Sequence, residues 1–199
     1  MTEIVLIRHA STDHIGKILT GRQPGISINK EGTEQALTLS HRLARKKLSA
    51  IYCSPLDRAI QTAEYIAKSK GINLITSNDF NELDFGIWTG MKIDDLNNDP
   101  VFKRFNLFRS ITRIPGGELI LEAQYRIVNG ILKVCLGYPE TNIAIVSHSD
   151  MIKIAVTYFA GMHIDMMQRL EISPASVSII NLDVEYTRII LLNSPDGIL

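Results

Sequence analysis

The sequence of 199 residues predicts an α/β fold, a three-layer sandwich in which helices cover both faces of a mostly parallel central sheet. Short β-branched apolar runs, typical of strands buried on both faces, alternate with longer segments whose apolar residues recur at helical spacing. The length suits one domain, and the 45% of residues that are apolar are enough to form a core. The sequence contains no repeat, low-complexity segment or linker, so residues 1–199 are expected to form a single domain.

The first part of the chain alternates strand and helix patterns. The strands are predicted by short β-branched apolar runs such as Ile-Val-Leu-Ile, and the helices by apolar residues that share one face. Gly71 is expected to end the second helix. The expected elements are a strand at 4–7, an irregular stretch at 10–29, a helix from about 31 to 46, a strand at 50–53, a helix at 56–67 and a weaker strand at 73–76.

The second part begins with an insertion at about 79–117, where mixed polarity and scattered aromatic residues predict loops and short helices that cap the fold. A helix at 118–136 follows, with Leu121, Tyr125, Val128, Leu132 and Cys135 expected to face inward. The remaining elements are a strand at 142–146, a helix at 149–159 and two strands at 176–182 and 187–192 that predict a hairpin or adjacent edge strands.

The composition excludes several classes of function. The 21 basic residues balance the 21 acidic ones, so no overall field attracts nucleic acid or an anionic membrane. The sequence contains neither a signal-peptide pattern nor an apolar run of the ~18 residues that a membrane span needs, so we expect a cytoplasmic protein. The distant Cys53 and Cys135 are expected to be core residues, and no spacing typical of metal ligands occurs, so neither a metal nor a cofactor is expected.

Polar residues follow three of the predicted strands, at the point where each strand ends. The first strand leads to Arg8 and His9, the second to Ser54 and then Arg58, and the strand at 142–146 to His148. Because ligands of parallel α/β sheets bind outside the carboxyl ends of the strands, we expect these side chains to meet at one place.

The strings around these residues resemble the histidine phosphatase superfamily, which includes the phosphoglycerate mutases, and are most similar to small bacterial phosphatases of that family. The resemblance covers nearly the whole chain, and the second string below is its most specific part. The matching strings are VLIRHA at 5–10, SPLDRAIQTA at 54–63, ELDFGIWTG at 82–90, GGE at 116–118, VSH at 146–148 and PASVS at 174–178.

The resemblance implies a phosphoglycerate mutase-like fold and a role for each central residue. It implies that His9 attacks phosphorus and becomes phosphohistidine, while Arg8, Arg58 and His148 donate hydrogen bonds to the phosphoryl oxygens. Glu82 matches the acid that protonates the leaving group, so burial is expected to raise its pKa. The arginines supply positive charge, so this reaction needs no metal.

Other positions are less specific. By the same resemblance, Gly21 and Arg22 line the pocket near the phosphate and the leaving group, although Arg22 can equally be a surface cation. His14 lies nearest to the place where the family usually has Asn, and it either replaces that donor or the contact is lost. Ser149 follows His148 in place of the more usual Gly, and Leu119 stands where many relatives carry Ser.

Several further residues have simple structural interpretations. Ser54 is expected to cap the helix that follows it, and Lys153 to be solvated or near the rim of the site. His41 and His163 have no matching motif and are expected to be structural or exposed. The insertion carries four large apolar residues that form either local core or a pocket wall for an apolar leaving group, namely Phe102, Phe105, Leu107 and Phe108.

Three functions are compared. A metal-independent phosphomonoesterase acting on a small phosphorylated metabolite is preferred, because the chain is short and lacks the longer insertion and the string around Thr12 that are typical of mutases. The alternatives are a phosphoglycerate mutase and a catalytically silent module that binds a phospholigand, which would need no proton donor such as Glu82. The late strands offer an edge for a homodimer. Phosphosugars, phosphoserine, phosphoglycerate and α-ribazole phosphate all stay open as substrates.

Overall fold

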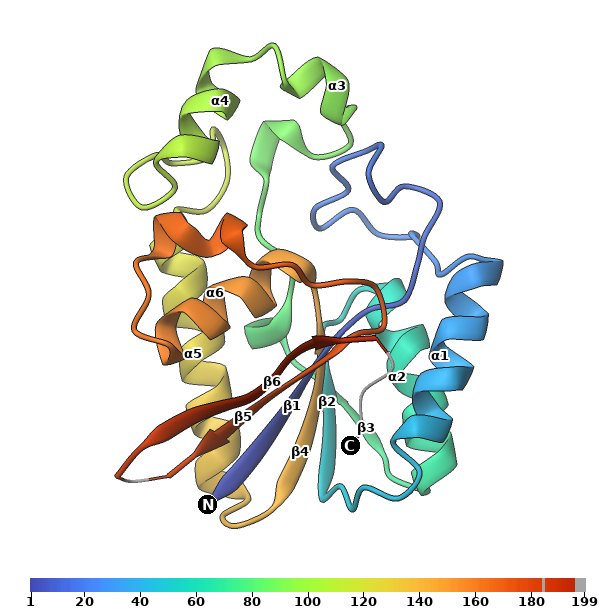
Figure 1. The fold of residues 1–199 in the computed structure, drawn as a ribbon. Coiled ribbons are helices and arrows are strands. Elements are labelled where there is room, and N and C mark those ends of the chain that lie inside the picture. Colours follow the sequence, from blue (N-terminus) through green and yellow to red (C-terminus); the bar gives the residue numbers. More distant parts are fainter. Residues whose placement is uncertain (184, 196–199) are drawn as a thin grey trace.

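The sheet of the protein has six strands in the order β3-β2-β4-β1-β5-β6 (Figure 1). The structure, a computed structural model, describes residues 1–183 and 185–195. Among the described strands, three of the five pairings are parallel, and β5 pairs antiparallel with both β1 and β6. The predicted α/β class with a mostly parallel sheet is therefore confirmed. The strands are β1 (Thr2–Arg8), β2 (Ala50–Cys53), β3 (Leu74–Thr76), β4 (Asn142–Ser147), β5 (Val177–Leu182) and β6 (Thr187–Ser194).

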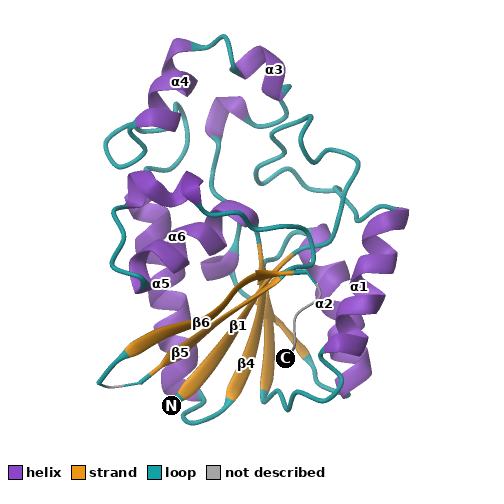
Figure 2. Cartoon of the chain, in the orientation of Figure 1, coloured by secondary structure: helices purple, strands orange, loops and turns teal. Residues whose placement is uncertain are grey.

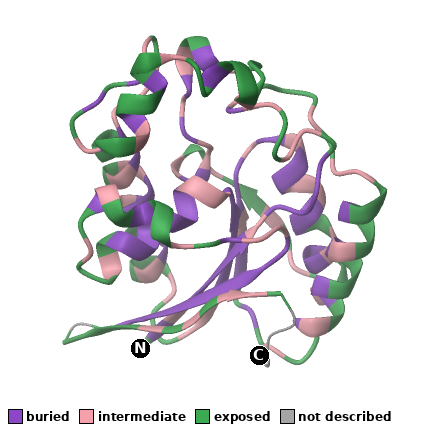
Figure 3. Cartoon of the chain, turned by 45° about the horizontal axis from the view of Figure 1, so that its top comes forward, coloured by how far each residue is buried: buried purple, intermediate pink, exposed green. Residues whose placement is uncertain are grey.

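Helices cover both faces of this sheet (Figure 2). On β1, Ile4 and Leu6 belong to one hydrophobic cluster and Val5 and Ile7 to another, because successive strand residues point to opposite faces. All four side chains are fully buried, so β1 lies between two cores (Figure 3). The first cluster is completed by α5 (Ile120–Gly137) and α6 (Ser149–Phe159), and the second by α1 (Lys30–Arg42) and α2 (Asp57–Lys70).

The segment between β3 and α5 lies beyond the carboxyl ends of the parallel strands (Figure 1). Its aromatic residues form a local core, in which the Trp88 ring packs edge-on against Phe102 and at a tilt against Phe105. The local-core interpretation is therefore correct for Phe102 and Phe105, whereas Leu107 and Phe108 are exposed. The short helices here are η1 (Asn78–Phe80), η2 (Gly86–Trp88), α3 (Ile93–Leu96) and α4 (Pro100–Leu107), and η3 (Ile164–Arg169) follows α6.

The structure corrects the predicted inward face of α5. Tyr125 is 76% exposed, and Leu121 and Leu132 are also exposed, whereas Ile127 and Ile131 are fully buried. The helix carries two adjacent apolar stripes, and apolar periodicity alone does not decide which stripe meets the sheet. Of the predicted set, Val128 is buried and Cys135 is half-buried.

Two predicted helix boundaries are also wrong. The first helix ends at Arg42 rather than near residue 46, because Leu43 already forms its C-cap and residues 43–46 make turns. The helix α5 begins at Ile120, which leaves Glu118 in the preceding loop. Within residues 1–183 and 185–195, no helix combines the length and apolar composition needed to cross a membrane.

Candidate active site

The carboxyl ends of β1, β2 and β4 lie side by side, because β4 pairs with both of the other strands. The register places Arg8 opposite Ser147, and the next backbone N–H, that of His9, donates to the Ser147 carbonyl at 2.9 Å. On the other side of β4, the Ser54 N–H donates to the Val146 carbonyl at 2.9 Å. Three segments that are distant in sequence therefore bring their polar ends together, as the sequence predicts.

His9 is a buried histidine with one free ring nitrogen. Its Nδ1 lies 2.8 Å from the Ala10 carbonyl oxygen, and since a carbonyl only accepts, Nδ1 carries the proton. Burial, reinforced by the charges of Arg58 and Arg8, holds the pKa of His9 well below its usual 6.5. The ring is therefore neutral near pH 7, with an unprotonated Nε2 in a side chain that lines the cavity.

The backbone next to His9 is fixed by α2. The Ala10 N–H donates to Thr62 Oγ1 at 2.9 Å, and that hydroxyl donates to the Arg58 carbonyl at 2.7 Å. Thr62 is fully buried and stands one helical turn after Arg58. One threonine thus links the loop of His9 to the helix that carries Arg58.

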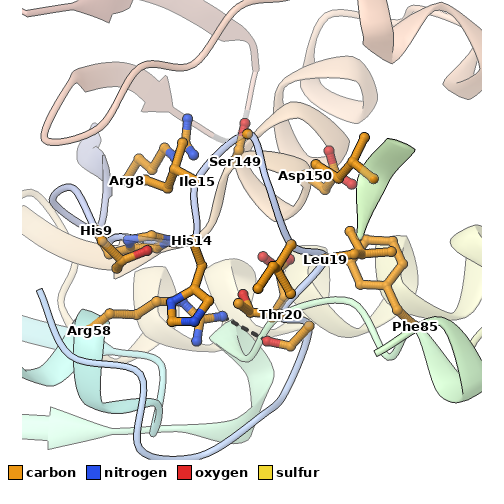
Figure 4. A pocket seen from close by; sticks show the side chains of 16 residues that line it. Arg8, His9, His14, Ile15, Leu19, Thr20, Arg58, Phe85, Ser149 and Asp150 are labelled. Atoms are coloured by element: carbon orange, nitrogen blue, oxygen red, sulfur yellow. Dashed lines mark hydrogen bonds between the residues drawn. The ribbon is translucent and has the colours of Figure 1, made fainter. Parts of the chain in front are cut away.

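Arg8 and Arg58 line the same cavity, and each retains a buried N–H without a partner. Arg8 Nη1 donates to the Ile172 carbonyl at 2.6 Å. Arg58 Nη2 donates to the Gly21 carbonyl at 2.7 Å, the dashed line that starts at Arg58 in Figure 4. Among the described residues, Arg8 Nε and Arg58 Nη1 have no hydrogen-bond partner although both atoms are buried. Burying such donors unpaired costs free energy, so two arginines of one cavity that each keep a free donor favour an anion there.

His148 is fully buried and lies beside His9, with 5.2 Å between the ring centroids. Its Nε2 is 2.8 Å from Ser54 Oγ, and its Nδ1 is 3.5 Å from Glu82 Oε2. Burial, with the charge of Arg58, lowers the pKa of His148 well below 6.5, so the ring is neutral. If the Ser54 hydroxyl donates to Nε2, Nδ1 carries the proton and can donate to a ligand.

Ser54 differs from its expected role. The helix α2 begins at Asp57 with Leu56 as a cap that makes no side-chain hydrogen bond, and Ser54 Oγ lies 3.4 Å from the Leu56 nitrogen. The shorter 2.8 Å contact with His148 is therefore the main hydrogen bond of Ser54. The expectation of a helix cap is wrong, and Ser54 instead orients His148.

Glu82 lies on the cavity wall with its carboxyl group largely withdrawn from solvent. Burial raises the pKa of Glu82 to about 7, and the negative charge of Asp150 acts in the same direction. The charge of Arg58 and the Leu83 N–H, which donates to Glu82 Oε1 at 2.9 Å, limit this rise. The carboxyl group can therefore exist in both protonation states near neutral pH, which is what an acid that later acts as a base requires.

An ionic network holds the backbone around Glu82. Arg22 Nε donates to the Glu82 carbonyl at 2.8 Å, and Glu118 accepts from Arg22 at 2.7 Å and from Arg126 at 3.0 Å. Although burial raises the pKa of Glu118, its hydrogen bond with Arg126 lowers that pKa overall, so the carboxylate is charged. The guanidinium group of Arg126 also donates to the carbonyls of Asn78, Asp79, Asn81 and Glu82.

The less specific candidates separate into two groups. Gly21, His14 and Ser149 line the cavity, and Gly21 has a φ of +49°, in the left-handed region that glycine adopts without strain. Arg22 is not among the described residues that line the cavity, and its guanidinium group faces the carbonyl of Glu82 and the carboxylate of Glu118. The sequence prediction that Arg22 lines the pocket therefore does not match its position.

Other polar residues lie outside the cavity. Lys153 is 7% exposed and its Nζ donates to Gln168 Oε1 at 3.3 Å, so the expectation of a solvated or rim lysine is wrong. Lysine carries a long apolar stem, and α6 is packed closely enough to bury it. His41 is exposed, and His163 is the N-cap of η3.

The cavity itself has a volume of about 170 Å³. The strand-end residues of this cavity were predictable from the sequence. Asp150 and the network of Glu118 and Arg126 were not, because ion pairs between distant segments leave no local pattern. For this network, the sequence offered one signal, the GGE string at 116–118 that contains Glu118. The cavity is lined by Arg8, His9, Thr12, His14, Ile15, Gly16, Ile18, Leu19, Thr20, Gly21, Arg58, Glu82, Phe85, Ile93, Ser149 and Asp150.

Comparisons with known proteins agree on one family. Residues 4–195 match the model of the histidine phosphatase superfamily (branch 1). The chain is 26% identical over 198 residues to phosphoserine phosphatase 1 of Hydrogenobacter thermophilus, covering 97% of this chain and 92% of the relative. It is 28% identical over 181 residues to a probable phosphoglycerate mutase of Salmonella choleraesuis, covering 89% of this chain and 84% of that protein.

A solved structure shares the whole architecture. The crystal structure of a mutant phosphoserine phosphatase from Entamoeba histolytica, in complex with phosphoserine, superposes with a TM-score of 0.87 and 25% sequence identity. The match covers 100% of this chain and 100% of that one. The likeness therefore includes the segment between β3 and α5 as well as the sheet.

Proposed function

The chain belongs to the histidine phosphatase superfamily (branch 1), and we propose that it is a metal-independent phosphomonoesterase that hydrolyses a small phosphorylated metabolite through a phosphohistidine on His9. The observation that carries the proposal is the neutral His9 ring, whose unprotonated Nε2 belongs to a cavity shared with two buried arginines that retain free donors. Glu82, whose pKa is about 7, lies in the same cavity and is the proton donor of the proposal.

In the first step, the free N–H groups of Arg8 and Arg58 and the Nδ1–H of His148 bind the phosphoryl oxygens. His9 Nε2 attacks phosphorus, so an N–P bond forms while the ester P–O bond breaks. Glu82 gives its proton to the leaving oxygen, which departs as an alcohol. The arginines stabilise the charge that spreads over the phosphoryl oxygens during transfer.

In the second step, water attacks the phosphohistidine from the side that the alcohol has left. The Glu82 carboxylate takes a proton from that water, the N–P bond breaks, and inorganic phosphate is released. His9 recovers its lone pair on Nε2, while its Nδ1–H stays on the Ala10 carbonyl throughout. The network of Arg22, Arg126 and Glu118 acts by holding Glu82 in place.

Further observations support what we propose for the cap, the oligomeric state and the partners. The segment 79–117 acts as a cap, because Phe85 and Ile93 from it line the cavity. The edge strand β6 is available for a homodimer. The balanced net charge supports an enzyme that requires no nucleic acid or membrane partner, and we propose that it acts in the cytoplasm.

The test is inorganic phosphate release from a panel of small phosphomonoesters, measured beside isomerisation of phosphoglycerate. We expect hydrolysis to exceed isomerisation, and His9→Ala to lose at least about a thousandfold in kcat. His41→Ala, which changes an exposed histidine of α1, is the control and should retain activity. Normal turnover by His9→Ala would contradict the proposal. Faster isomerisation would favour the mutase alternative, and inactivity on the whole panel would favour the binding module.

A further inference from the structure

The charges along the cavity are divided between two sides. Arg8 and Arg58 stand with His9, whereas Asp150 lies on the opposite side of the pocket in Figure 4. Among the described residues that line the cavity there is no lysine and no third arginine. Once a phosphate dianion is bound by the two arginines, the rest of the described cavity lining therefore offers a leaving group no lysine or arginine.

Asp150 is fixed with its carboxylate toward the cavity. It stands in the first turn of α6, and Arg109 Nη1 contacts its Oδ2 at 3.4 Å. The Asp150 side chain is 20% exposed and that of Arg109 only 5% exposed. Two further contacts fix the guanidinium group of Arg109: its Nη2 donates to Asn106 Oδ1 at 2.6 Å, and the group stacks over the Phe105 ring. Arg109 thus orients Asp150, and only Asp150 of the pair lines the cavity.

The electrostatic consequence is a preference among leaving groups. A carboxylate or second phosphate on the leaving group meets Asp150 and apolar side chains such as Leu19 and Phe85, with no further lysine or arginine among the described lining residues to bind it. An ammonium group meets an oriented carboxylate in a partly desolvated place, where opposite charges attract more strongly than in water. The negative charge of Asp150 also acts on Arg8 and Glu82, which places it close enough to matter for the bound substrate.

We propose that Asp150 is a specificity residue that selects phosphomonoesters whose leaving group carries an ammonium group, as in amino-alcohol phosphates, over those whose leaving group carries only a carboxylate. This inference rests on the proposed phosphomonoesterase function. A purely structural role of Asp150, as the partner of Arg109 and of the positive N-terminal end of α6, would instead affect all substrates equally.

The test compares kcat/KM for three esters of similar size in the wild type, Asp150→Asn and Asp150→Glu. Phosphoethanolamine carries an ammonium group, hydroxyethyl phosphate is its neutral counterpart, and phosphoglycolate carries a carboxylate. For each variant, kcat/KM for phosphoethanolamine and for phosphoglycolate is divided by kcat/KM for hydroxyethyl phosphate. When these ratios are compared between variants, the intrinsic reactivity of each ester cancels. We expect Asp150→Asn to lower the phosphoethanolamine ratio about tenfold and to raise the phosphoglycolate ratio, and Asp150→Glu to retain the preference.

The matched control is Glu171→Gln, which removes an exposed acidic charge that acts on Arg8 but does not line the cavity. Its ratios should equal those of the wild type. Unchanged ratios in Asp150→Asn would overturn the inference, whereas failure of the wild type to hydrolyse any ester would overturn the proposed function instead. If Asp150→Asn does not fold, the wild type decides: a KM for phosphoethanolamine below that for hydroxyethyl phosphate supports the inference, and an equal or higher KM contradicts it.

Discussion

At the scale of single residues, one hydrogen bond decides which nitrogen of His9 is unprotonated. The Ala10 carbonyl at 2.8 Å holds the proton on Nδ1, and burial, reinforced by the charges of Arg58 and Arg8, keeps the ring neutral by lowering its pKa. The same arginines lower the pKa of Glu82, but burial and Asp150 outweigh them. A neutral histidine and a carboxyl group that is partly protonated near pH 7 therefore coexist in one small cavity.

The opposite pKa shifts predict the pH dependence of hydrolysis. Because the proton of Glu82 is lost from the free enzyme as the pH rises through about 7, kcat/KM for alkyl phosphates should fall above that pH. On the acid side, activity should persist until the pH lies well below 6.5, where His9 becomes protonated. A rate that rises steadily between pH 7 and pH 9 would be incompatible with Glu82 as the donor.

Replacing Glu82 separates substrates by their leaving groups. In Glu82→Gln we expect kcat for alkyl phosphates to fall about 10²–10⁴-fold, because the alkoxide leaves without a proton. An activated aryl phosphate needs no proton and should lose less than about tenfold, and the decline above pH 7 should disappear. Glu64→Gln, on an exposed position of α2, is the control for steady-state measurements. Equal losses for both kinds of substrate would remove Glu82 from the proton-transfer step.

At the scale of elements, Arg126 of α5 connects a helix to the loop of Glu82. Lysine at this position keeps the charge but cannot reach the four carbonyls and Glu118 together. We expect Arg126→Lys to lower the free energy of unfolding by about 2–4 kcal/mol and to lower kcat for alkyl phosphates about 10- to 100-fold, with a smaller loss for aryl phosphates.

The comparison for this prediction is Arg113→Lys, which changes an exposed arginine that pairs with Glu122. Thermal denaturation and the ratio of alkyl to aryl kcat should stay close to the wild type in this variant. If Arg126→Lys reduced stability but left that ratio unchanged, the network would support only the fold and not the acid.

The loops at 84–86 and 115–117 pack closely against each other through their backbones. Gly86 has a φ of +48°, and a Cβ there would lie 2.2 Å from the Pro115 carbonyl oxygen. We therefore expect Gly86→Ala to lower the free energy of unfolding by at least about 2 kcal/mol in denaturant titrations. Gly25→Ala, at a φ of +75° in open space, should cost only ~1–2 kcal/mol from backbone strain. Equal costs would show that the contact with Pro115 is unimportant.

At the scale of the whole molecule, the site depends on strand order. The β4 strand lies between β1 and β2, so that His148 meets His9 on one side and Ser54 on the other. These contacts join residues more than ninety positions apart, since His148 and Ser54 are separated by 94 positions. Nothing in any single segment encodes the distance between them.

Much of this arrangement could nevertheless be predicted from the sequence. The strands β1, β2, β4 and β5 were predictable because each is a short apolar run that is largely buried, and the residues at the ends of β1, β2 and β4 were the predicted site residues. The buried face of α5 was not predictable, because two apolar stripes compete. Ser54, Glu118 and Asp150 acquire their contacts only through tertiary structure, which puts His148, Arg126 and Arg109 beside them. The catalytic roles stay predictions until they are measured.

The most direct test of the account is trapping of the covalent intermediate. The protein is mixed with a phosphomonoester labelled in its phosphoryl group, quenched during turnover, and the labelled peptide is identified. We expect an acid-labile, base-stable adduct on His9, absent from His9→Ala and retained in His41→Ala. Turnover of the ester without any adduct on His9 under rapid quenching, or an adduct on another residue, would contradict the central claim.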